Sequence, residues 1–454
     1  MCFMGMVHTF EMHGLKLALD VESGALHVLD GPGFLAVEKL AQGLAVDDVQ
    51  KEAASEFGEE TARQVMAEIC ELQEKGLLFS EPREVDLSSD GVVKALCLHL
   101  AHDCNLRCKY CFAGEGHYGG NRGLMPLETA KKAVDFLLEK SKGRKHVEID
   151  FFGGEPLLNF QVLKDTVEYG KARAQEMGKV LKFTVTTNAL RMPGEVLEYL
   201  NREGMSIVLS LDGREEVHDR MRVLPGGGKS WQRVLENCKA VVKGRGGDNY
   251  YLRGTYTRHN LDFSKDIDVM IEEGFDRISL EPAVLSPEAA EALQSEDVPV
   301  LEKEYEKLAQ KLWQREEQGE KVFFFHFELD LHQGPCAKKR AQGCGAGAAY
   351  LAVTPEGSLY PCHQFAGDED FCCGHVDSGV KDGLLTRFAA VDSANKEACR
   401  DCFARFFCGG GCHAAAWSMN QDMEKPYELG CTLHRKRVEC GLYLQAKRML
   451  ASIG

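Results

Sequence analysis

The feature that most constrains the fold is a strand–helix unit that repeats through the middle of the chain. Six segments have the apolar pattern of strands, at residues 95–100, 147–152, 181–187, 206–211, 251–257 and 277–282. Helical patterns separate them, as at residues 127–139, 160–177 and 231–243. Near-continuous apolar strands alternating with helices are typical of a parallel sheet covered by helices. The repeat therefore predicts an α/β fold, with a partial (β/α)6 TIM-like barrel over residues 92–285.

Regions of different pattern flank this barrel. In residues 1–85, short stretches alternate apolar and polar residues around turns at His13–Gly14 and Glu22–Ser23–Gly24, and helical patterns follow near 32–40 and 60–75. Short antiparallel strands followed by helices predict a winged-helix-like module. Residues 286–333 are charged and helical, and we expect them to bridge the barrel to the last region. Residues 334–454 are loop-rich and cysteine-rich, so we expect them to fold around metals.

Charge and hydropathy exclude several classes of protein. The chain has 454 residues and a net charge of -16, so binding of nucleic acid over its whole surface is not expected. No apolar run is long enough to span a bilayer. The first ten residues, MCFMGMVHTF, lack the basic and apolar segments of a secretory signal. We therefore expect a cytoplasmic protein that binds neither nucleic acid nor membrane.

The eighteen cysteines are unevenly distributed. Three lie within eight residues, at Cys104, Cys108 and Cys111, and eleven fall between Cys336 and Cys440. Disulfides are poorly supported in a reducing compartment, so clustered thiols there favour metal binding. The cysteines outside any clear spacing are expected to pack as small apolar side chains; they are Cys2, Cys70, Cys97, Cys238, Cys372, Cys373 and Cys440.

The stretch CNLRCKYC supplies three thiols and no fourth. A [4Fe–4S] cluster normally takes four thiolate ligands, so three would leave one iron without a protein ligand. An open metal position is typical of reactive rather than structural sites. Such an iron offers a place for the amine and carboxylate of a small molecule. The alternative is a zinc knuckle completed by His99 or His117.

The spacing C-x3-C-x-aromatic-C, with Tyr110 as the aromatic residue, resembles the motif of the radical S-adenosylmethionine (SAM) superfamily. The resemblance implies an enzyme, an oxidoreductase, whose catalytic Cys104, Cys108 and Cys111 hold a [4Fe–4S] cluster. It implies that the unique iron binds the methionine end of SAM and that reduction releases a 5′-deoxyadenosyl radical.

Polar motifs stand at the ends of the predicted strands, where barrel enzymes place their active sites. They are the three-cysteine loop, Gly153–Gly154–Glu155–Pro156, Thr186–Thr187–Asn188, Ser210–Leu211–Asp212–Gly213 and Glu281–Pro282. By the same resemblance, Gly153, Gly154 and Glu155 would bind the methionine ammonium, and Ser210 would contact SAM. Arg222 is a candidate for the SAM carboxylate or ribose, and the alternative for it is a plain surface arginine.

The C-terminal cysteines have the spacing C-x12-G-x4-C, then C-x2-C-x5-C-x3-C, then a last cysteine. This spacing resembles the SPASM extension of peptide-modifying radical SAM enzymes, which holds two auxiliary [4Fe–4S] clusters. The resemblance assigns Cys344, Cys362 and Cys412 to auxiliary cluster I, with Cys336 as its natural fourth ligand unless that position stays open for substrate. It assigns Cys399, Cys402, Cys408 and Cys431 to auxiliary cluster II. Two zinc sites are the alternative.

The N-terminal module is too acidic for a DNA-binding winged helix. Residues 1–90 carry six basic residues against eighteen acidic ones, whereas phosphate contacts need the opposite balance. The module resembles the leader-peptide recognition element of peptide-modifying enzymes, in which an extended peptide adds a strand to a sheet edge. A purely structural cap is the alternative.

Residues 7–30 and 344–365 narrow the resemblance to maturases of six-cysteine SCIFF peptides. It implies an enzyme that joins a cysteine sulfur to a carbon of another residue in a precursor peptide with a leader sequence, supplied with electrons by a ferredoxin or flavodoxin. The alternatives are an anaerobic sulfatase-maturase-like oxidase, a carbon–carbon cross-linker, or a zinc scaffold without catalysis. His363 and His413, beside cluster cysteines, are expected to pack behind the ligands.

Overall fold

The six predicted strands lie side by side in one sheet, in the order in which they occur along the chain. The computed structural model describes residues 5–82, 91–331, 343–381 and 383–453. In it the strands are β4 (Ala95–His102), β7 (His146–Gly153), β8 (Val180–Thr187), β9 (Ser206–Ser210), β11 (Tyr250–Tyr256) and β12 (Arg277–Pro282). Each pairs in parallel with the next. The parallel sheet is therefore confirmed, and predicted and observed strand bounds differ by at most two residues.

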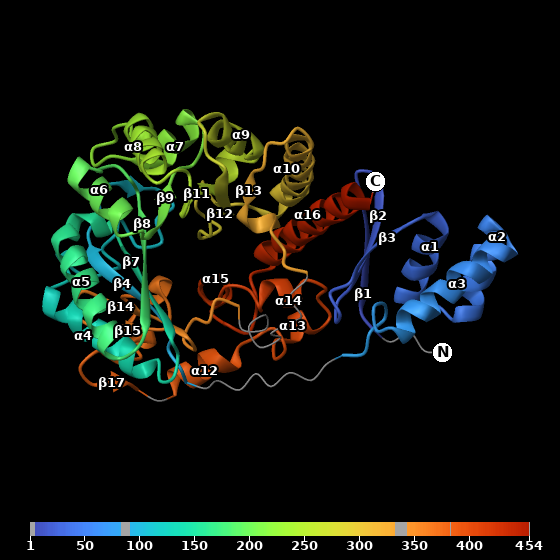
Figure 1. The fold of residues 1–454 in the computed structure, drawn as a ribbon, viewed down its shortest axis with the longest axis horizontal. Coiled ribbons are helices and arrows are strands. Elements are labelled where there is room, and N and C mark those ends of the chain that lie inside the picture. Colours follow the sequence, from blue (N-terminus) through green and yellow to red (C-terminus); the bar gives the residue numbers. More distant parts are fainter. Residues whose placement is uncertain (1–4, 83–90, 332–342, 382, 454) are drawn as a thin grey trace.

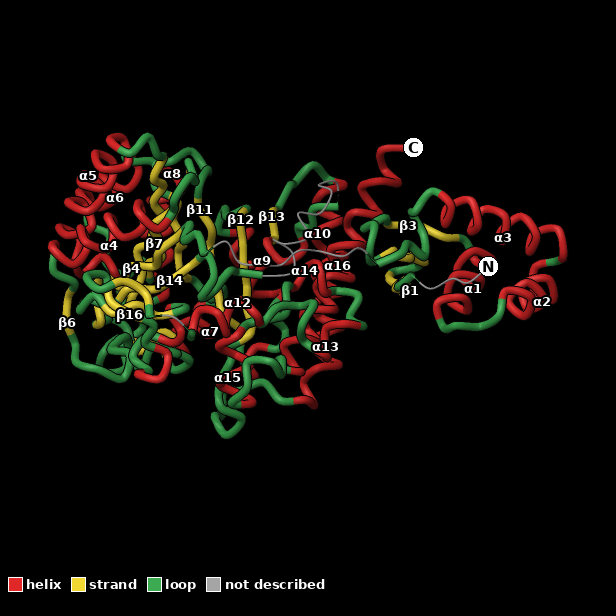
Figure 2. Tube along the Cα trace, turned by 90° about the horizontal axis from the view of Figure 1, so that it is seen from below, coloured by secondary structure: helices red, strands yellow, loops and turns green. Residues whose placement is uncertain are grey.

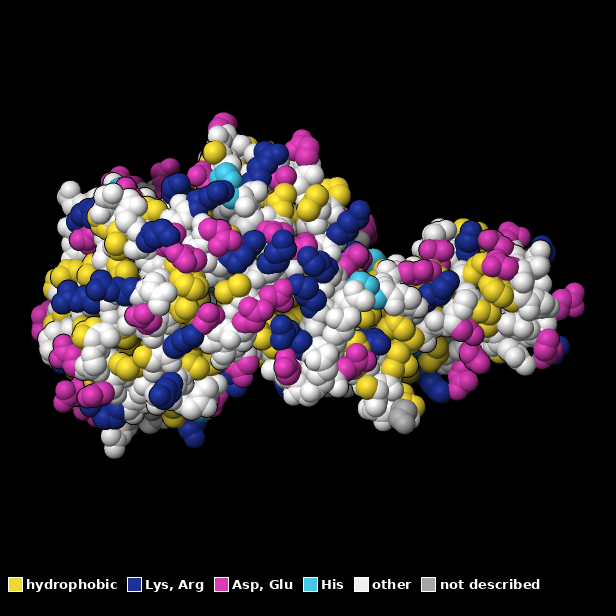
Figure 3. All heavy atoms as spheres, turned by 90° about the horizontal axis from the view of Figure 1, so that it is seen from above, with side chains coloured by type: hydrophobic (Ala, Val, Ile, Leu, Met, Phe, Trp, Pro, Cys, Tyr) yellow, Lys and Arg dark blue, Asp and Glu magenta, His cyan; other side chains and the backbone are white. Residues whose placement is uncertain are grey.

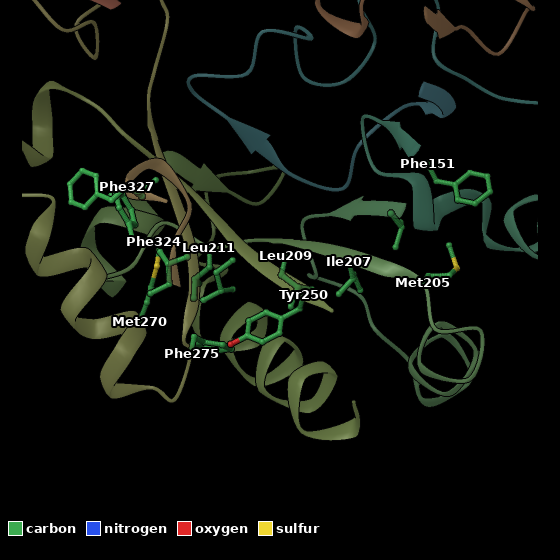
Figure 4. Close-up of a cluster of buried hydrophobic side chains, with 14 of the residues drawn as sticks. Phe151, Met205, Ile207, Leu209, Leu211, Tyr250, Met270, Phe275, Phe324 and Phe327 are labelled. Atoms are coloured by element: carbon green, nitrogen blue, oxygen red, sulfur yellow. The ribbon is translucent and has the colours of Figure 1, made fainter. Parts of the chain in front are cut away.

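Helices cover the outer side of this curved sheet (Figure 1). They are α4 (Leu127–Lys140), α5 (Phe160–Glu176), α6 (Gly194–Arg202), α7 (Glu215–Met221), α8 (Trp231–Gly244) and α9 (Ser264–Glu272). In β7 the apolar Val147, Ile149 and Phe151 are buried, whereas Glu148 is exposed. Such alternation places one apolar face against the helices and leaves a polar inner face. Figure 4 shows part of the apolar layer, with side chains of β9 and β11 packed beside helices.

The sheet extends beyond the six strands at both edges. On one side, β13 (Phe323–Phe324) pairs in parallel with β12. On the other, β14 (Tyr350–Val353) pairs in parallel with β4, and β15 (Ser358–Tyr360), β16 (Gly374–His375) and β17 (Gly379–Val380) follow in antiparallel order. The region predicted as a separate cysteine-rich domain thus continues the barrel sheet. The domain bounds 1–85, 92–285, 286–333 and 334–454 stay predictions.

The N-terminal unit combines a three-stranded antiparallel sheet with three helices. The strands are β1 (Val7–Met12), β2 (Leu15–Asp20) and β3 (Leu26–Leu29), in that order in the sheet. The helices are α1 (Gly31–Ala41), α2 (Val46–Phe57) and α3 (Glu59–Glu74). Helix α2 was not predicted, since it buries only Val49 and Ala53 and so shows a narrow apolar stripe. The likeness to a winged helix stays a prediction.

Two long helices join the C-terminal region to the rest of the molecule. Helix α10 (Val298–Glu317) lies in the predicted charged helical segment, and α16 (Glu428–Ile453) packs against it. Between β17 and α16 lie the short helices α12 (Leu384–Ala390), α13 (Glu397–Arg400), α14 (Arg405–Cys408) and α15 (His413–Asn420). Many of the cysteines stand on or beside these short helices, so loops and single turns present the thiols.

The N-terminal unit contacts the C-terminal region through polar and aromatic groups. Nε2 of His8 lies 3.0 Å from Oε1 of Glu439 on α16, and the His8 ring stacks on Phe403 with centroids 3.5 Å apart. Arg405 forms an ion pair with the buried Glu22. Figures 1 and 2 show the unit at one end of the molecule, beyond α16.

The surface carries no single dominant basic patch on the face shown in Figure 3, where acidic and basic side chains are interspersed. Within the described part of the chain, every helix is too short or too polar to cross a membrane.

Candidate active site

The three-cysteine loop is held by backbone pairing as it leaves β4. A two-residue strand, β5 (Arg107–Cys108), pairs antiparallel with β10 (Arg222–Val223), and Arg222 lies opposite Cys108. The backbone N–H of Lys109 also donates to the carbonyl of Met221, at 3.0 Å. A loop without regular structure of its own is thereby fixed against the end of α7.

One cavity of about 310 Å³ opens at the carboxyl ends of the strands, beside this loop. Among the predicted residues, it is lined by Cys104, Cys108, Cys111, Tyr110, Gly153, Gly154, Ser210, Arg222 and Cys412. Parallel strands place their carboxyl ends at one edge, which is why residues from Cys104 to Glu281 meet here. The C-terminal region thus contributes a thiol to the cavity of the barrel.

Burial controls the state of the loop thiols. It raises the pKa of Cys104 to about 12 and that of Cys108 to about 12, although the charge of Arg222 opposes the shift at Cys108. The backbone N–H of Leu106 points at Sγ of Cys104 from 3.4 Å. Free thiols are therefore protonated at neutral pH, and metal binding would release protons.

Gly153 and Gly154, at the end of β7, allow the backbone of residues 101–103 to approach closely. A Cβ on Gly154 would lie 2.2 Å from the carbonyl oxygen of Asp103, and one on Gly153 would lie 2.4 Å from that of Ala101. Gly153 also has a φ of 123°, which disfavours other residues. The glycines thus allow β7 to pack on the start of the cysteine loop as well as to line the cavity.

Glu155 is not among the residues that line the cavity. It is buried and accepts hydrogen bonds from Oγ1 of Thr187 at 2.8 Å, from the backbone N–H of Asn188 at 2.8 Å and from that of Leu157 at 3.0 Å. Burial raises its pKa to about 7, and these donors act in the opposite direction. Glu155 therefore ties the end of β7 to the end of β8, and the cavity is left to the backbone of the preceding glycines.

Arg222 is a buried arginine, not a surface one. Its guanidinium pairs with Oδ2 of the fully buried Asp212 at 3.0 Å and lies 5.5 Å from the centre of the Tyr110 ring. The hydroxyl of Tyr110 donates to the same Asp212 oxygen. The motif residue Tyr110 is thus locked to the end of β9 by a charge-assisted network.

Two charged residues of the cavity were missed as a pair. Arg253, on β11, lies 3.6 Å from Glu281 at the end of β12, and both line the cavity. Burial alone would raise the pKa of Glu281, but His326, Arg253 and Arg437 outweigh it and lower the pKa to about 2. Glu281 is therefore ionised at physiological pH. An arginine inside the otherwise apolar segment 251–257 was the available sequence signal.

Three thiols assigned to the first auxiliary set, Cys344, Cys362 and Cys412, interact electrostatically with one another. Burial raises the pKa of Cys362, and the neighbouring Cys412 and Cys344 raise it further. Cys412 faces the cavity together with His363. The predicted fourth member, Cys336, lies outside the described residues.

The second auxiliary set also converges. Burial raises the pKa of Cys431 to about 12, with added contributions from Cys408 and Cys399. It raises the pKa of Cys408 to about 11, and Cys399 and Cys402 add to that shift. Three of these cysteines come from the loop around α13 and α14 and one from α16, so α16 closes the set.

The donor chemistry of these sets is sulfur throughout, which both iron–sulfur clusters and zinc accept. In the described ranges, no three histidine, cysteine or acidic side chains converge as ligands of a single metal ion would. A [4Fe–4S] cluster binds each thiolate through a different iron, so its ligands stand further apart.

Several of the remaining candidates have partners within the protein, whereas the buried Nδ1 of His117, the other alternative zinc ligand, has no hydrogen-bond partner among the described residues. His99, an alternative zinc ligand, is fully buried with Nδ1 3.0 Å from Nε2 of His102. His363 meets the Tyr350 hydroxyl at 3.0 Å, and His413 meets the carbonyl of Val391 at 3.0 Å. Cys373 is buried in the main apolar core, as expected for a packing cysteine.

A model of the radical SAM superfamily matches residues 98–263 of this chain. An uncharacterized protein of Methanocaldococcus jannaschii is 31% identical over 152 residues, which is 34% of this chain and 48% of its own. A cysteine-type anaerobic sulfatase-maturating enzyme of Clostridium novyi is 22% identical over 332 residues, 68% of this chain and 85% of its own. The chain thus spans about half the length of the first of these relatives.

Two solved structures share the fold over most of their length. The structure of anSMEcpe with bound AdoMet and Cp18Cys peptide superposes with a TM-score of 0.65 at 18% identity, covering 79% of this chain and 99% of that one. Streptococcus suis SuiB bound to its precursor peptide SuiA gives a TM-score of 0.53 at 15% identity, covering 93% and 98%. At these identities the likeness concerns the fold.

Proposed function

We propose that this chain, built around a radical SAM domain, is a peptide maturase that forms thioether crosslinks from a cysteine sulfur to a carbon in a ribosomally made, cysteine-rich precursor peptide. The observation that carries the proposal is one cavity lined both by the three-thiol loop of the barrel and by Cys412 of the C-terminal region. A substrate in this cavity lies between a radical-generating site and an auxiliary thiol set.

Three [4Fe–4S] clusters and SAM are the proposed cofactors. Cys104, Cys108 and Cys111 would hold the first cluster, and the two C-terminal sets would hold the auxiliary ones, with Cys336 as the proposed fourth ligand of cluster I. Backbone of Gly153 and Gly154, with Ser210 and Arg222, would contact SAM. When bound, these groups supply one-electron cleavage of SAM, abstraction of a hydrogen atom from an unactivated carbon, and an outlet for the electron that carbon–sulfur bond formation releases.

The chain's own residues orient the reactants and keep water out. Tyr110 and Arg222, fixed on Asp212, hold the loop and one wall of the cavity in place. Phe112 and Phe152 line another wall and give it an apolar surface, which protects a reactive intermediate from side reactions. On the wall formed by β11 and β12, Arg253 and Glu281 present fixed charges.

The N-terminal unit is the proposed binding site for the leader of the precursor peptide. Its sheet has two edge strands, β1 and β3, and an extended peptide can add to such an edge. Its acidic composition favours a leader with basic residues. SuiB, which shares the fold, was solved with a precursor peptide, and this supports the assignment. A ferredoxin or flavodoxin is the proposed electron donor.

The test is reaction of the anaerobically reconstituted protein with SAM, a reductant and a cysteine-rich candidate precursor peptide, sought among the reading frames beside its gene. Loss of two hydrogens and of one free thiol per crosslink, measured by mass spectrometry after thiol alkylation, supports a thioether. The C104A/C108A/C111A variant is the control and leaves the peptide unchanged. Peptide modification by this variant would overturn the proposal.

A second function, oxidation or carbon–carbon cross-linking of a peptide, is favoured by the similarity to the Clostridium novyi sulfatase-maturating enzyme over 68% of the chain. Both reactions remove hydrogen from the peptide without joining a sulfur to a new carbon at a crosslink. A carbon–carbon crosslink differs from a thioether because it leaves every cysteine open to alkylation. Oxidation differs from both because fragmentation of the product shows no bond between two side chains. A scaffold without catalysis would instead carry zinc and no iron.

A further inference from the structure

Lys396, just before α13, is a buried lysine. Only 2% of its surface is exposed, and its Nζ donates to the carbonyl of Gly410 at 2.7 Å. Lysine is almost never buried to this extent unless an anion compensates its charge. The charge of Lys396 therefore needs an anionic partner, and the identity of that partner bears on the function of this region.

Carboxylates do not provide the compensation. Among the described residues, none lies within ion-pair distance of the Lys396 ammonium. The nearest buried acid in sequence, Asp392, is committed to its own turn. Its Oδ1 accepts from the backbone N–H groups of Ala394 at 2.8 Å and Asn395 at 2.9 Å, and its Oδ2 accepts from the Asn395 side chain at 3.1 Å.

The ammonium lies within electrostatic range of thiols from both auxiliary sets. Cys399, Cys408 and Cys431 of the second set and Cys412 of the first all interact electrostatically with it. His413 is near enough for the Lys396 charge to act on it as well. Neutral thiols cannot balance a buried cation, whereas thiolates bound to a cluster can.

We infer that Lys396 is the internal counter-cation of the auxiliary sites and raises the reduction potential of the clusters they would hold. The inference rests on the proposed function for the presence of the clusters. A cluster with four thiolates is anionic and gains one more negative charge on reduction, so a nearby fixed cation stabilises the reduced form more than the oxidised form. Burial strengthens the effect, because little water is present to screen it.

The alternative is a mechanical role, in which Lys396 merely ties the Gly410 carbonyl into the loop. The two roles differ in what they require. The mechanical role needs a hydrogen-bond donor of suitable length, whereas the electrostatic role needs a positive charge. Charge-keeping and charge-removing substitutions therefore separate them.

The experiment uses the full chain with C104A/C108A/C111A, so that only auxiliary clusters contribute signals. Lys396→Met and Lys396→Gln remove the charge, and Lys396→Arg keeps it. Arg400→Met is the matched control, because Arg400 stands between Cys399 and Cys402 but is exposed to solvent. Iron content and the midpoint potential of each auxiliary cluster, followed by electron paramagnetic resonance, are the readouts.

We expect Lys396→Met and Lys396→Gln to keep their iron and to lower the potential of at least one auxiliary cluster, with Lys396→Arg close to the parent and Arg400→Met shifted less. Loss of clusters in both uncharged variants but not in Lys396→Arg also supports the counter-cation. Uncharged variants with the potential of Arg400→Met, or loss of clusters in all three Lys396 variants, would overturn the inference. Absence of iron from the parent would instead reject the proposed function.

Discussion

Arg222 lies opposite Cys108 in the antiparallel pair of β10 and β5, so a buried cation stands beside the middle thiol of the three-cysteine loop. The same guanidinium holds the fully buried Asp212 at 3.0 Å. One arginine thus links the loop, the end of β9 and the wall of the cavity, and its removal affects both stability and the site.

Replacement of Arg222 by methionine is expected to lower the free energy of unfolding of the metal-free protein by about 3 kcal/mol, because Asp212 would be left buried without its cation. Unfolding in urea under reducing conditions measures this. Arg220→Met, which removes an exposed arginine from the same turn, is the control and should change stability by less than about 0.5 kcal/mol. Equal effects of the two substitutions would show that the ion pair with Asp212 contributes nothing.

Replacement of Gly154 by alanine is expected to displace the start of the cysteine loop, since the new Cβ would lie 2.2 Å from the Asp103 carbonyl oxygen. Backbone cannot yield as a flexible side chain does, so we expect a loss of about 1–3 kcal/mol in stability. We also expect the reconstituted protein to lose about four of its roughly twelve irons.

Gly143→Ala is the matched control for this substitution. Gly143 is exposed, and a Cβ there would meet no atom within 4 Å. Iron content and unfolding of Gly143→Ala should equal those of the parent. If Gly154→Ala behaves in the same way, the close approach of the two backbones is not needed to form the loop.

The parallel sheet was predictable, and the cysteine spacings were recognisable, because their patterns are local. Each strand is a short apolar run, and each cysteine set has a spacing that can be recognised in the sequence without knowledge of the fold. Strand ends such as Gly153 and Ser210 could be placed in one site because parallel strands align their ends. These inferences needed only the order of strands along the chain.

Features that depend on long-range contacts were not predictable. The pairing of β14 with β4 joins segments about 250 residues apart, and the sequence of β14 does not indicate which strand it pairs with. The orientation of the Glu155 carboxylate depends on hydrogen-bond donors at Thr187 and Asn188. The motif therefore predicted the position of Glu155 in the fold but not the orientation of its side chain. Lys396 looked like any surface lysine, because burial of a single charged residue leaves no periodic signal.

Single substitutions in the two auxiliary sets should remove iron independently. Cys362→Ala and Cys431→Ala are each expected to lower the iron content from about twelve to about eight per chain, and the double variant to about four, with cleavage of SAM retained. Cys373→Ala is the control, because Cys373 is buried in the apolar core outside both sets, and it should keep about twelve irons. A fall to about four irons in either single variant would mean that the two sets form one site.

His218 is expected to make the protein less stable in acid. It is fully buried, and its neutral ring satisfies both nitrogens, since Nδ1 accepts from the backbone N–H of Asp212 at 3.3 Å and Nε2 meets the Ser230 hydroxyl at 3.0 Å. Burial lowers its pKa from 6.5 to about 4, so the unfolded chain binds more protons than the folded one between these values, and stability falls as the pH falls. This contribution to the free energy of unfolding is complete above about pH 7 and smaller by about 2 kcal/mol at pH 5.

Urea unfolding of the metal-free protein between about pH 7 and about pH 5 measures this effect. The difference in stability between the parent and His218→Gln should shrink as the solution is acidified. His146→Gln, at an exposed histidine, is the control and should follow the pH dependence of the parent. A constant difference for His218→Gln would mean that His218 takes up its proton as readily in the folded protein as in the unfolded chain.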